Sequence, residues 1–143
     1  MNFSSFTGGQ FALNNAGQTA FAGLLVGGGV DASNDQGVWS ESSGNLALVA
    51  REGSHAPGTP SGVNFGGEGF SNPVLNDVGQ TAFQARLAGS GVDVTNGFGI
   101  WSEGTGSLAL VARGGDHAPG TPSGVKFESF DPDIVLNLSL IHI

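Results

Sequence analysis

The stretch NDVGQTAF at residues 76–83 recurs, with two changes, as NNAGQTAF at residues 14–21, which is 62 positions earlier. Outward from this motif, residues 13–65 align without gaps on residues 75–127, and 35 of these 53 positions are identical. Identity at this level is too high for convergence on a shared composition, so the chain contains two copies of one unit. Such periodic self-similarity is typical of repeat architectures, whose units bury one another's apolar faces.

The sequence of each unit predicts four short β-strands. The Asn-x-x-Gly start of the motif predicts a turn, because glycine accepts a positive φ there. The strand that follows alternates in polarity, with Thr81, Phe83 and Leu87 on one face. A glycine-rich loop then leads to a third strand, and a tight Ser-Gly or Thr-Gly hairpin leads to a fourth. The predicted strands are 11–14, 18–25, 37–41 and 46–51 in the first unit, and 73–76, 80–87, 99–103 and 108–113 in the second.

The register of the hairpin in the first unit follows from its turn. It should place Trp39 opposite Leu48 and Val38 opposite Val49, on opposite faces. Both faces of the hairpin would then be partly apolar. We therefore expect the sheet to be covered on both sides.

The best-preserved stretch is HAPGTPSGV at residues 55–63, which returns unchanged at residues 117–125. Two prolines and two glycines in this stretch exclude a regular element and predict a rigid connector. Phe65 and Phe127 follow, and we expect them to anchor the connector on the core. Four short strands and a stiff crossing are typical of a β-propeller blade.

The fold prediction is all-β: two four-stranded antiparallel sheets, resembling propeller blades, packed face to face, with a β-sandwich-like arrangement as the alternative. A closed propeller has about 4 to 8 blades, so two sheets alone should leave an apolar face exposed and prone to association. The residues expected between the sheets are Phe21, Trp39, Leu46, Leu48, Phe83, Trp101, Leu108 and Leu110.

The repeat also predicts how the chain divides. Residues 1–10 are expected to be a partial preceding repeat, with Phe3 and Phe6 in the places of Phe65 and Phe70. Residues 138–143 resemble read-through of a sequencing adapter and are expected to be a non-native tail, the alternative being a genuine apolar terminal strand. Between them the predicted units are 11–72, 73–130 and the start of a third at 131–137.

Composition excludes several classes of function. The 12 acidic and 4 basic residues give a net charge of -8, which leaves no cationic surface for a nucleic acid. The absence of cysteine removes disulfides, thiolate metal sites and cysteine nucleophiles. No stretch approaches the roughly 18 apolar residues that predict a membrane span, and the first residues lack the basic and apolar regions of a signal peptide.

Histidine and glutamate recur once in each unit. His55 and His117 could serve as metal ligands or in proton transfer, but each lacks a second ligand at a recognisable spacing, and we expect bonds to connector carbonyls instead. Glu41 and Glu103 follow a tryptophan by two residues, as in a sugar-binding strand. Glycoside hydrolysis needs two carboxylates in unlike environments about 5 to 10 Å apart, and equivalent positions give like environments. A structural role is therefore favoured for both glutamates.

Trp39 and Trp101 could be stacking platforms for a sugar, although packing between sheets is the favoured interpretation. The glycine-rich loops offer weak calcium candidates, because hard cations prefer oxygen ligands. The alternating spacing of an EF-hand loop is missing, so ordinary Asx turns are the alternative. We assign no catalytic residue, no cofactor and no metal site, and the weak calcium candidates are Asp31, Asn34, Asp35, Asp93 and Asn96.

Repetition itself argues against a catalytic site. A residue that recurs in every unit satisfies a constraint that every unit shares, whereas a catalytic site needs unlike residues that meet at one point. A local function should therefore reside in positions that differ between the units. The differences that stand out are Leu24 against Arg86, Asp35 against Gly97, Gln36 against Phe98, Glu52 against Gly114, and Ser54 against Asp116.

The two Asn-x-x-Gly-x-x-Ala-Phe motifs, which begin at Asn14 and Asn76, resemble the signature of a bacterial family of tandem-repeat proteins named for that motif. The resemblance runs from about residue 11 to 137. It implies an exported or cell-surface protein, a propeller-like array and varied C-terminal anchors, and it supplies no catalytic residue. The short length of this chain suggests a fragment of a longer protein.

The sequence thus favours a non-enzymatic structural or interaction module. Its expected partners are neighbouring repeats of a longer chain, or a second copy that associates through exposed blade faces. One alternative is a propeller module that binds carbohydrate or a calcium-dependent ligand. A further alternative is a fragment of a glycan-active enzyme.

Overall fold

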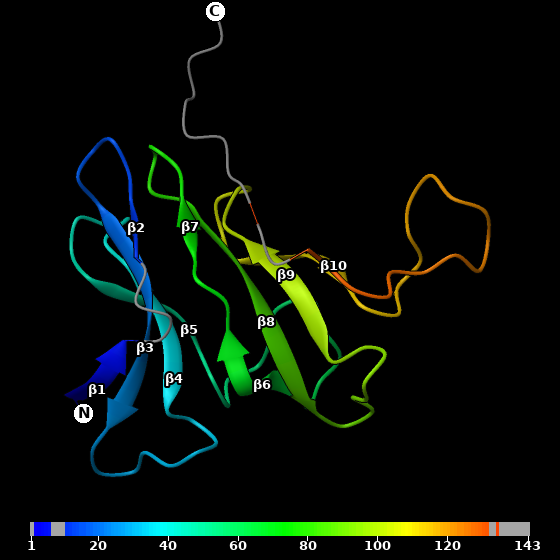
Figure 1. The fold of residues 1–143 in the computed structure, drawn as a ribbon, viewed down its shortest axis with the longest axis horizontal. Coiled ribbons are helices and arrows are strands. Elements are labelled where there is room, and N and C mark those ends of the chain that lie inside the picture. Colours follow the sequence, from blue (N-terminus) through cyan, green and yellow to red (C-terminus); the bar gives the residue numbers. More distant parts are fainter. Residues whose placement is uncertain (1, 7–10, 132–133, 135–143) are drawn as a thin grey trace, which may run out of the picture.

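The computed structural model describes residues 2–6, 11–131 and 134. This part of the chain is all-β and forms two antiparallel sheets, as predicted (Figure 1). It contains no helix that could cross a membrane. The N-terminal sheet has β1 (Asn2–Phe6), β2 (Ala12–Leu13), β3 (Thr19–Val26), β4 (Gln36–Ser40) and β5 (Ala47–Arg51). The C-terminal sheet has β6 (Val63–Phe70), β7 (Val74–Leu75), β8 (Thr81–Gly89), β9 (Phe98–Ser102) and β10 (Ala109–Arg113).

Each sheet has one strand more than the four predicted. The strand order is β1-β3-β4-β5 in the N-terminal sheet, with β2 paired to β3, and β10-β9-β8-β6 in the C-terminal sheet, with β7 paired to β8. The extra strand opens each sheet and precedes the motif. Thus β6, which the sequence places at the end of the first unit, pairs with β8 of the second sheet. The predicted tail, residues 138–143, lies outside the described residues.

The extra strands occupy equivalent places in their sheets. Phe65 of β6 lies opposite Leu87, and Phe3 of β1 lies opposite Leu25, 62 residues before Leu87. Both strands contain an irregularity after this position. The backbone of β1 therefore pairs with β3 in the same register in which the backbone of β6 pairs with β8.

The predicted hairpin register is right at one pair and wrong at the next. Trp39 lies opposite Leu48, as expected, but Val38 lies opposite Ala50 instead of Val49. The cause is a β-bulge, in which one strand contributes two residues opposite one on its partner. The bulge leaves Val49 as the extra residue, and the second unit repeats it between Leu110 and Ala112.

The two sheets pack through unlike faces. On the C-terminal sheet, Phe83 and Trp101 are fully buried, and their rings stack with centroids 6.5 Å apart. On the N-terminal sheet, the buried partners are the small side chains Ala22, Val38 and Ala50, which belong to the same core cluster. An aromatic face thus packs on an alanine and valine face. We call these the aromatic face and the small-residue face of a sheet.

The prediction that Phe21 and Trp39 lie between the sheets is therefore wrong. Because side chains alternate along a strand, burial of Ala22 and Val38 turns Phe21 and Trp39 to the other side, where both are half-buried. Equivalent faces of the two sheets point the same way, so they cannot meet. Of the predicted leucines, Leu108 and Leu110 are partly buried against the core, whereas Leu46 and Leu48 are 48% and 52% exposed.

The motif turns also join the two sheets. Gly17 and Gly79 have φ of 80° and 84°, as the turn prediction requires. The Asn14 Oδ1 accepts hydrogen bonds from the backbone N–H groups at positions 16 and 18, and its Nδ2 donates to the Asn76 carbonyl oxygen at 2.9 Å. The Asn14 side chain therefore stabilises its own turn and also bonds this turn to the turn at Asn76. Asn15 and Asp77 add two contacts of 2.9 Å beside this bond.

Candidate functional site

The connector at residues 55–63 is closed by its own hydrogen bonds. The Ala56 N–H donates to the Val63 carbonyl oxygen at 3.2 Å, and the Thr59 hydroxyl donates to the Ala56 carbonyl oxygen at 2.6 Å. His55 Nδ1 lies 2.9 Å from the same Val63 oxygen. This arrangement agrees with the predicted connector-fixing role of histidine, and the second connector repeats it with His117 and Val125 at 3.0 Å.

The first connector is seated on the aromatic face of the C-terminal sheet. The indole Nε1 of Trp101 donates a hydrogen bond of 3.0 Å to the Pro57 carbonyl oxygen. Ala56 and Val63 are buried, with 0% and 1% exposure. Gly58 has φ of 80°, and a Cβ there would lie 2.8 Å from the Leu110 Cβ, so the close approach requires glycine. We call this contact of residues 55–63 with Trp101 and Leu110 the junction.

The strand after the connector belongs to the C-terminal sheet and also bonds the turn that follows β5. On one edge, Phe65 accepts from the Gly53 N–H at 2.7 Å and donates to the Ser54 carbonyl oxygen at 2.9 Å. On its other edge, it pairs with Leu87 of β8. Its ring is 3% exposed and meets Trp101 edge to face, with centroids 4.9 Å apart. The predicted anchor on the core is confirmed for Phe65.

Glu41 and Glu103 serve the sheets in which they lie. A carboxylate oxygen of Glu41 accepts from the Thr19 backbone N–H at 2.9 Å and from the Thr19 hydroxyl at 2.7 Å. Glu103 repeats both bonds with Thr81 at 2.9 and 2.6 Å. The Thr19 hydroxyl and then its backbone N–H lower the pKa of Glu41. Each carboxylate therefore ties the end of the third predicted strand to the start of the second.

The two tryptophans have different surroundings. Trp101 is fully buried in the junction, in agreement with the predicted packing between sheets. Trp39 lies on the outer aromatic face of the N-terminal sheet, where it stacks on Phe21 with ring centroids 6.1 Å apart. Trp101 thus lies on the aromatic face that packs between the sheets, whereas Trp39 lies on the aromatic face that points away from the other sheet.

The calcium candidates are engaged within their own loops. Asp31 accepts from the Ser33 N–H and hydroxyl at 2.8 and 2.5 Å, and the hydroxyl and then the N–H lower the pKa of Asp31. The Asn34 side chain accepts from the Asp31 N–H at 3.0 Å, and the Arg51 Nε donates to the Asn34 carbonyl oxygen at 2.9 Å. A guanidinium on the loop disfavours a cation there.

The loop of the second unit repeats these contacts. Asp93 accepts from the Thr95 N–H and hydroxyl at 2.8 and 2.6 Å, and the hydroxyl is the main cause that lowers the pKa of Asp93. The Asn96 side chain accepts from the Asp93 N–H at 2.8 Å. Within the part of the chain that the structure describes, no three His, Asp or Glu side chains form a group that could hold a metal ion.

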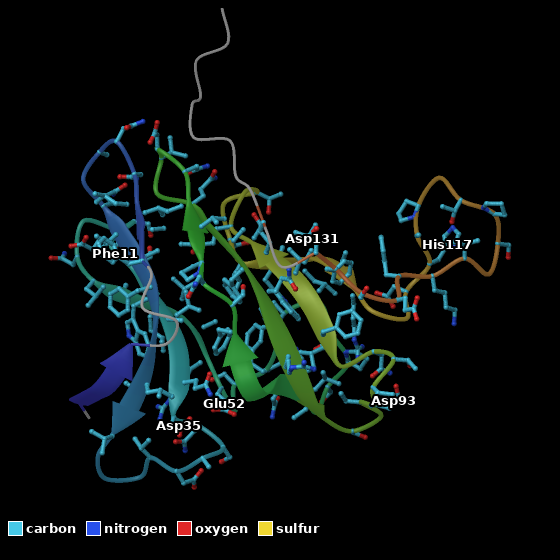
Figure 2. The ribbon with its side chains drawn as sticks, viewed as in Figure 1. Phe11, Asp35, Glu52, Asp93, His117 and Asp131 are labelled. Carbon is cyan, nitrogen blue, oxygen red and sulfur yellow. The ribbon has the colours of Figure 1, made fainter. Side chains whose placement is uncertain are left out.

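Asp35 lies apart from this loop network, beside Glu52 (Figure 2). Glu52 is 3% exposed, and its Oε2 is buried with no hydrogen-bond partner among the described residues. Burial, and then the neighbouring Asp35 carboxyl, raise the pKa of Glu52. The structure thus brings together two of the positions that the sequence singled out separately as differing between units.

The second unit fills the corresponding space with an aromatic ring. Gly97 and Gly114 stand in the places of Asp35 and Glu52, and a Cβ at Gly114 would lie 2.4 Å from the Phe98 ring. Phe98 also contacts Phe130, with ring centroids 5.5 Å apart. The acid pair therefore belongs to the first unit alone. In the sequence, the indication of this acid pair was that positions 35, 36 and 52 all differ from their counterparts in the second unit.

These features recur along the chain in one order: motif turn, hairpin, connector and opening strand. Comparisons with curated proteins and with solved structures gave no match. A protein-family model, described as a family of unknown function (DUF7453), matches residues 1–139 and so includes both motif turns and both connectors. Since this match covers nearly the whole sequence, the chain belongs to the family of unknown function DUF7453.

Proposed function

We propose that this chain is a non-enzymatic structural module whose sheets stack head to tail on sheets of the same kind, within an exported or cell-surface bacterial protein. The observation that carries the proposal is the junction. It joins a connector and small-residue face to the aromatic face of the next sheet. The two joined surfaces differ, and each sheet has one surface of each kind. The same contact can therefore join further sheets in a row.

The residues that the two units share support this proposal. His55 and His117 close the connectors, and Glu41 and Glu103 fasten neighbouring strands. These histidines and glutamates, which the sequence offered for acid–base chemistry, thus have structural tasks that are repeated in both units. Export and surface location come from the resemblance of the motif to exported tandem-repeat proteins.

A chain extended by one sheet tests the proposal. Phe127 corresponds to Phe65, so residues 1–127 can be continued with a second copy of residues 66–143. We expect the added sheet to seat on the second connector, to slow hydrogen exchange at the Lys126 amide, which corresponds to Asn64 opposite Ala88, and to raise the free energy of unfolding. The control is the same extension carrying Trp101→Ala in the added copy, which should lose this protection. An added sheet that leaves hydrogen exchange at residue 126 unchanged would contradict the proposal.

A further inference from the structure

The junction inside the chain shows how a connector joins the next sheet. Its loop is closed by Ala56, His55 and Thr59, and its opening strand then pairs with β8. In that pairing Asn64 lies opposite Ala88, and Phe65 lies opposite Leu87. The connector therefore presents a shaped loop and a strand together.

The second connector has the same shape but no sheet seated on it among the described residues. The Ala118 N–H donates to the Val125 carbonyl oxygen at 3.0 Å, and the Thr121 hydroxyl donates to the Ala118 oxygen at 2.6 Å. Val125 is 43% exposed, whereas its counterpart Val63 is 1% exposed. Figure 2 shows this loop, labelled at His117, projecting from the body of the molecule. The binding surface is therefore formed before any partner arrives.

The segment after this connector has one edge paired and one edge open. Phe127 accepts from the Gly115 N–H at 2.9 Å and donates to the Asp116 carbonyl oxygen at 3.0 Å, which are the bonds that Phe65 makes with residues 53 and 54. Within the described residues no strand pairs with its other edge, the one on which Phe65 meets β8. An edge of this kind is a template for pairing with another chain.

The sequence of this segment matches β1. Residues 127–130 read FESF, and residues 3–6 read FSSF. In β1, Asn2 lies opposite Val26 and Phe3 lies opposite Leu25, the register that β6 uses on β8. Lys126 and Phe127 therefore correspond to the first two residues of β1 as well as to Asn64 and Phe65.

We propose that residues 126–130 of one copy take the place of β1 on β3 of a second copy, with residues 117–125 seated on the outer aromatic face of that copy. The proposal rests on the head-to-tail function above and names its partner. Exchange of an equivalent element between copies is a low-cost route to association, because it replaces one strand pairing by the same pairing. The incoming connector adds burial of Ala118 and Val125, so the exchanged state gains apolar contacts.

The chain has no cysteine, which allows the register to be tested by cross-linking. The proposal places residue 126 of one copy opposite residue 26 of another. Both positions are exposed, with Val26 at 50%. A mixture of the single variants Val26→Cys and Lys126→Cys should form a disulfide-linked mixed dimer under mild oxidation. The control replaces the first variant by Val94→Cys, at a position that is 93% exposed but lies in the loop between β8 and β9 and not on β3. This mixture should cross-link several-fold more slowly.

A second pair of variants tests the connector surface. Val125→Asp should shift sedimentation toward monomer and slow the Val26–Lys126 cross-link, whereas Val94→Asp should do neither. At a dilution where the parent is monomeric, both variants should keep the melting temperature of the parent. Equal cross-linking of residue 126 to positions 26 and 94 would overturn the proposal. A faster disulfide between two copies of the Val26→Cys variant would also overturn the proposal, because it would indicate two-fold pairing of the copies. If the extended chain gains its third sheet while these cross-links fail, head-to-tail stacking stands and strand exchange between copies falls.

Discussion

The indole N–H of Trp101 donates a hydrogen bond to the backbone carbonyl of Pro57, 44 residues earlier, and so fastens the connector of one unit to the next sheet. The bond lies beside the buried rings of Phe65 and Phe83. The apolar contacts fix how closely the surfaces approach, and the bond fixes where the connector sits. Loss of the bond should therefore be separable from loss of the ring.

Trp101→Phe should lower the free energy of unfolding by about 1 to 3 kcal/mol, because the Pro57 oxygen loses its donor while an aromatic ring is kept. Urea denaturation measures this loss. Trp39→Phe is the matched control, since it changes an indole on the outer aromatic face and leaves the junction intact. Equal losses in the two variants would show that the Trp101–Pro57 bond has no special weight.

Asn14→Ala should destabilise the protein more than Asn76→Ala. Both side chains bond their own turn in the same way, but the Asn14 Nδ2 also donates to the Asn76 carbonyl oxygen in the other sheet. Their exposures are alike, 6% and 7%, so burial does not separate them. The difference should be about 0.5 to 1.5 kcal/mol, the net value of one hydrogen bond. Denaturation curves that coincide for the two variants would contradict an inter-sheet role for this bond.

The sequence predicted the parts of the fold that depend on local pattern. Alternation located β3 and β8, and the Asn-x-x-Gly spacing located the turns before them. It missed β6 as a strand, because the glycines at positions 66, 67 and 69 break the alternation. The Val38–Val49 pairing failed because a bulge adds a residue that no turn rule foresees.

The orientation of the sheets and the acid pair depend on tertiary contacts. Periodicity told which residues share a face, but it could not tell which face of the neighbouring sheet they meet. Asp35 and Glu52 were noted only as differences between the units. They become neighbours because β4 and β5 pair with Gly37 opposite Arg51, which brings the residues just outside both strands together.

Calcium should leave the melting temperature unchanged at millimolar concentration. The Asp31 and Asp93 carboxylates are already engaged by hydroxyl and backbone N–H groups, and Arg51 and Arg113 bond the same loops. A site in 100-fold ligand excess would add about 2.7 kcal/mol, which is a shift of several degrees. A thermal-shift titration, with magnesium at equal ionic strength as control, measures this. A calcium-specific rise of several degrees would establish a site that these loop contacts do not suggest.

The contributions of Glu52 and Glu41 to the free energy of unfolding should change with pH in opposite directions. The pKa of Glu52 is raised above its ordinary 4.5, so the folded state holds the proton more tightly than the unfolded chain. The stability from Glu52 is then fully present below 4.5 and is lost as pH rises through the folded-state pKa. Glu52→Gln cannot ionise, so it should be more stable than the parent at pH 7, with the gap closing toward about pH 4.

Glu41 supplies the matched comparison because its pKa is lowered below 4.5. The stability from Glu41 is present above 4.5 and is lost as pH falls through the lowered folded-state pKa. Glu41→Gln should therefore be less stable than the parent at pH 7, with the gap narrowing in acid as the parent loses its charge-assisted bonds to Thr19. Denaturation of the parent and both variants between about pH 3 and 8 measures the two gaps. A Glu52→Gln variant that is less stable than the parent at pH 7, like Glu41→Gln, would mean that the Asp35–Glu52 pair carries no buried-charge penalty.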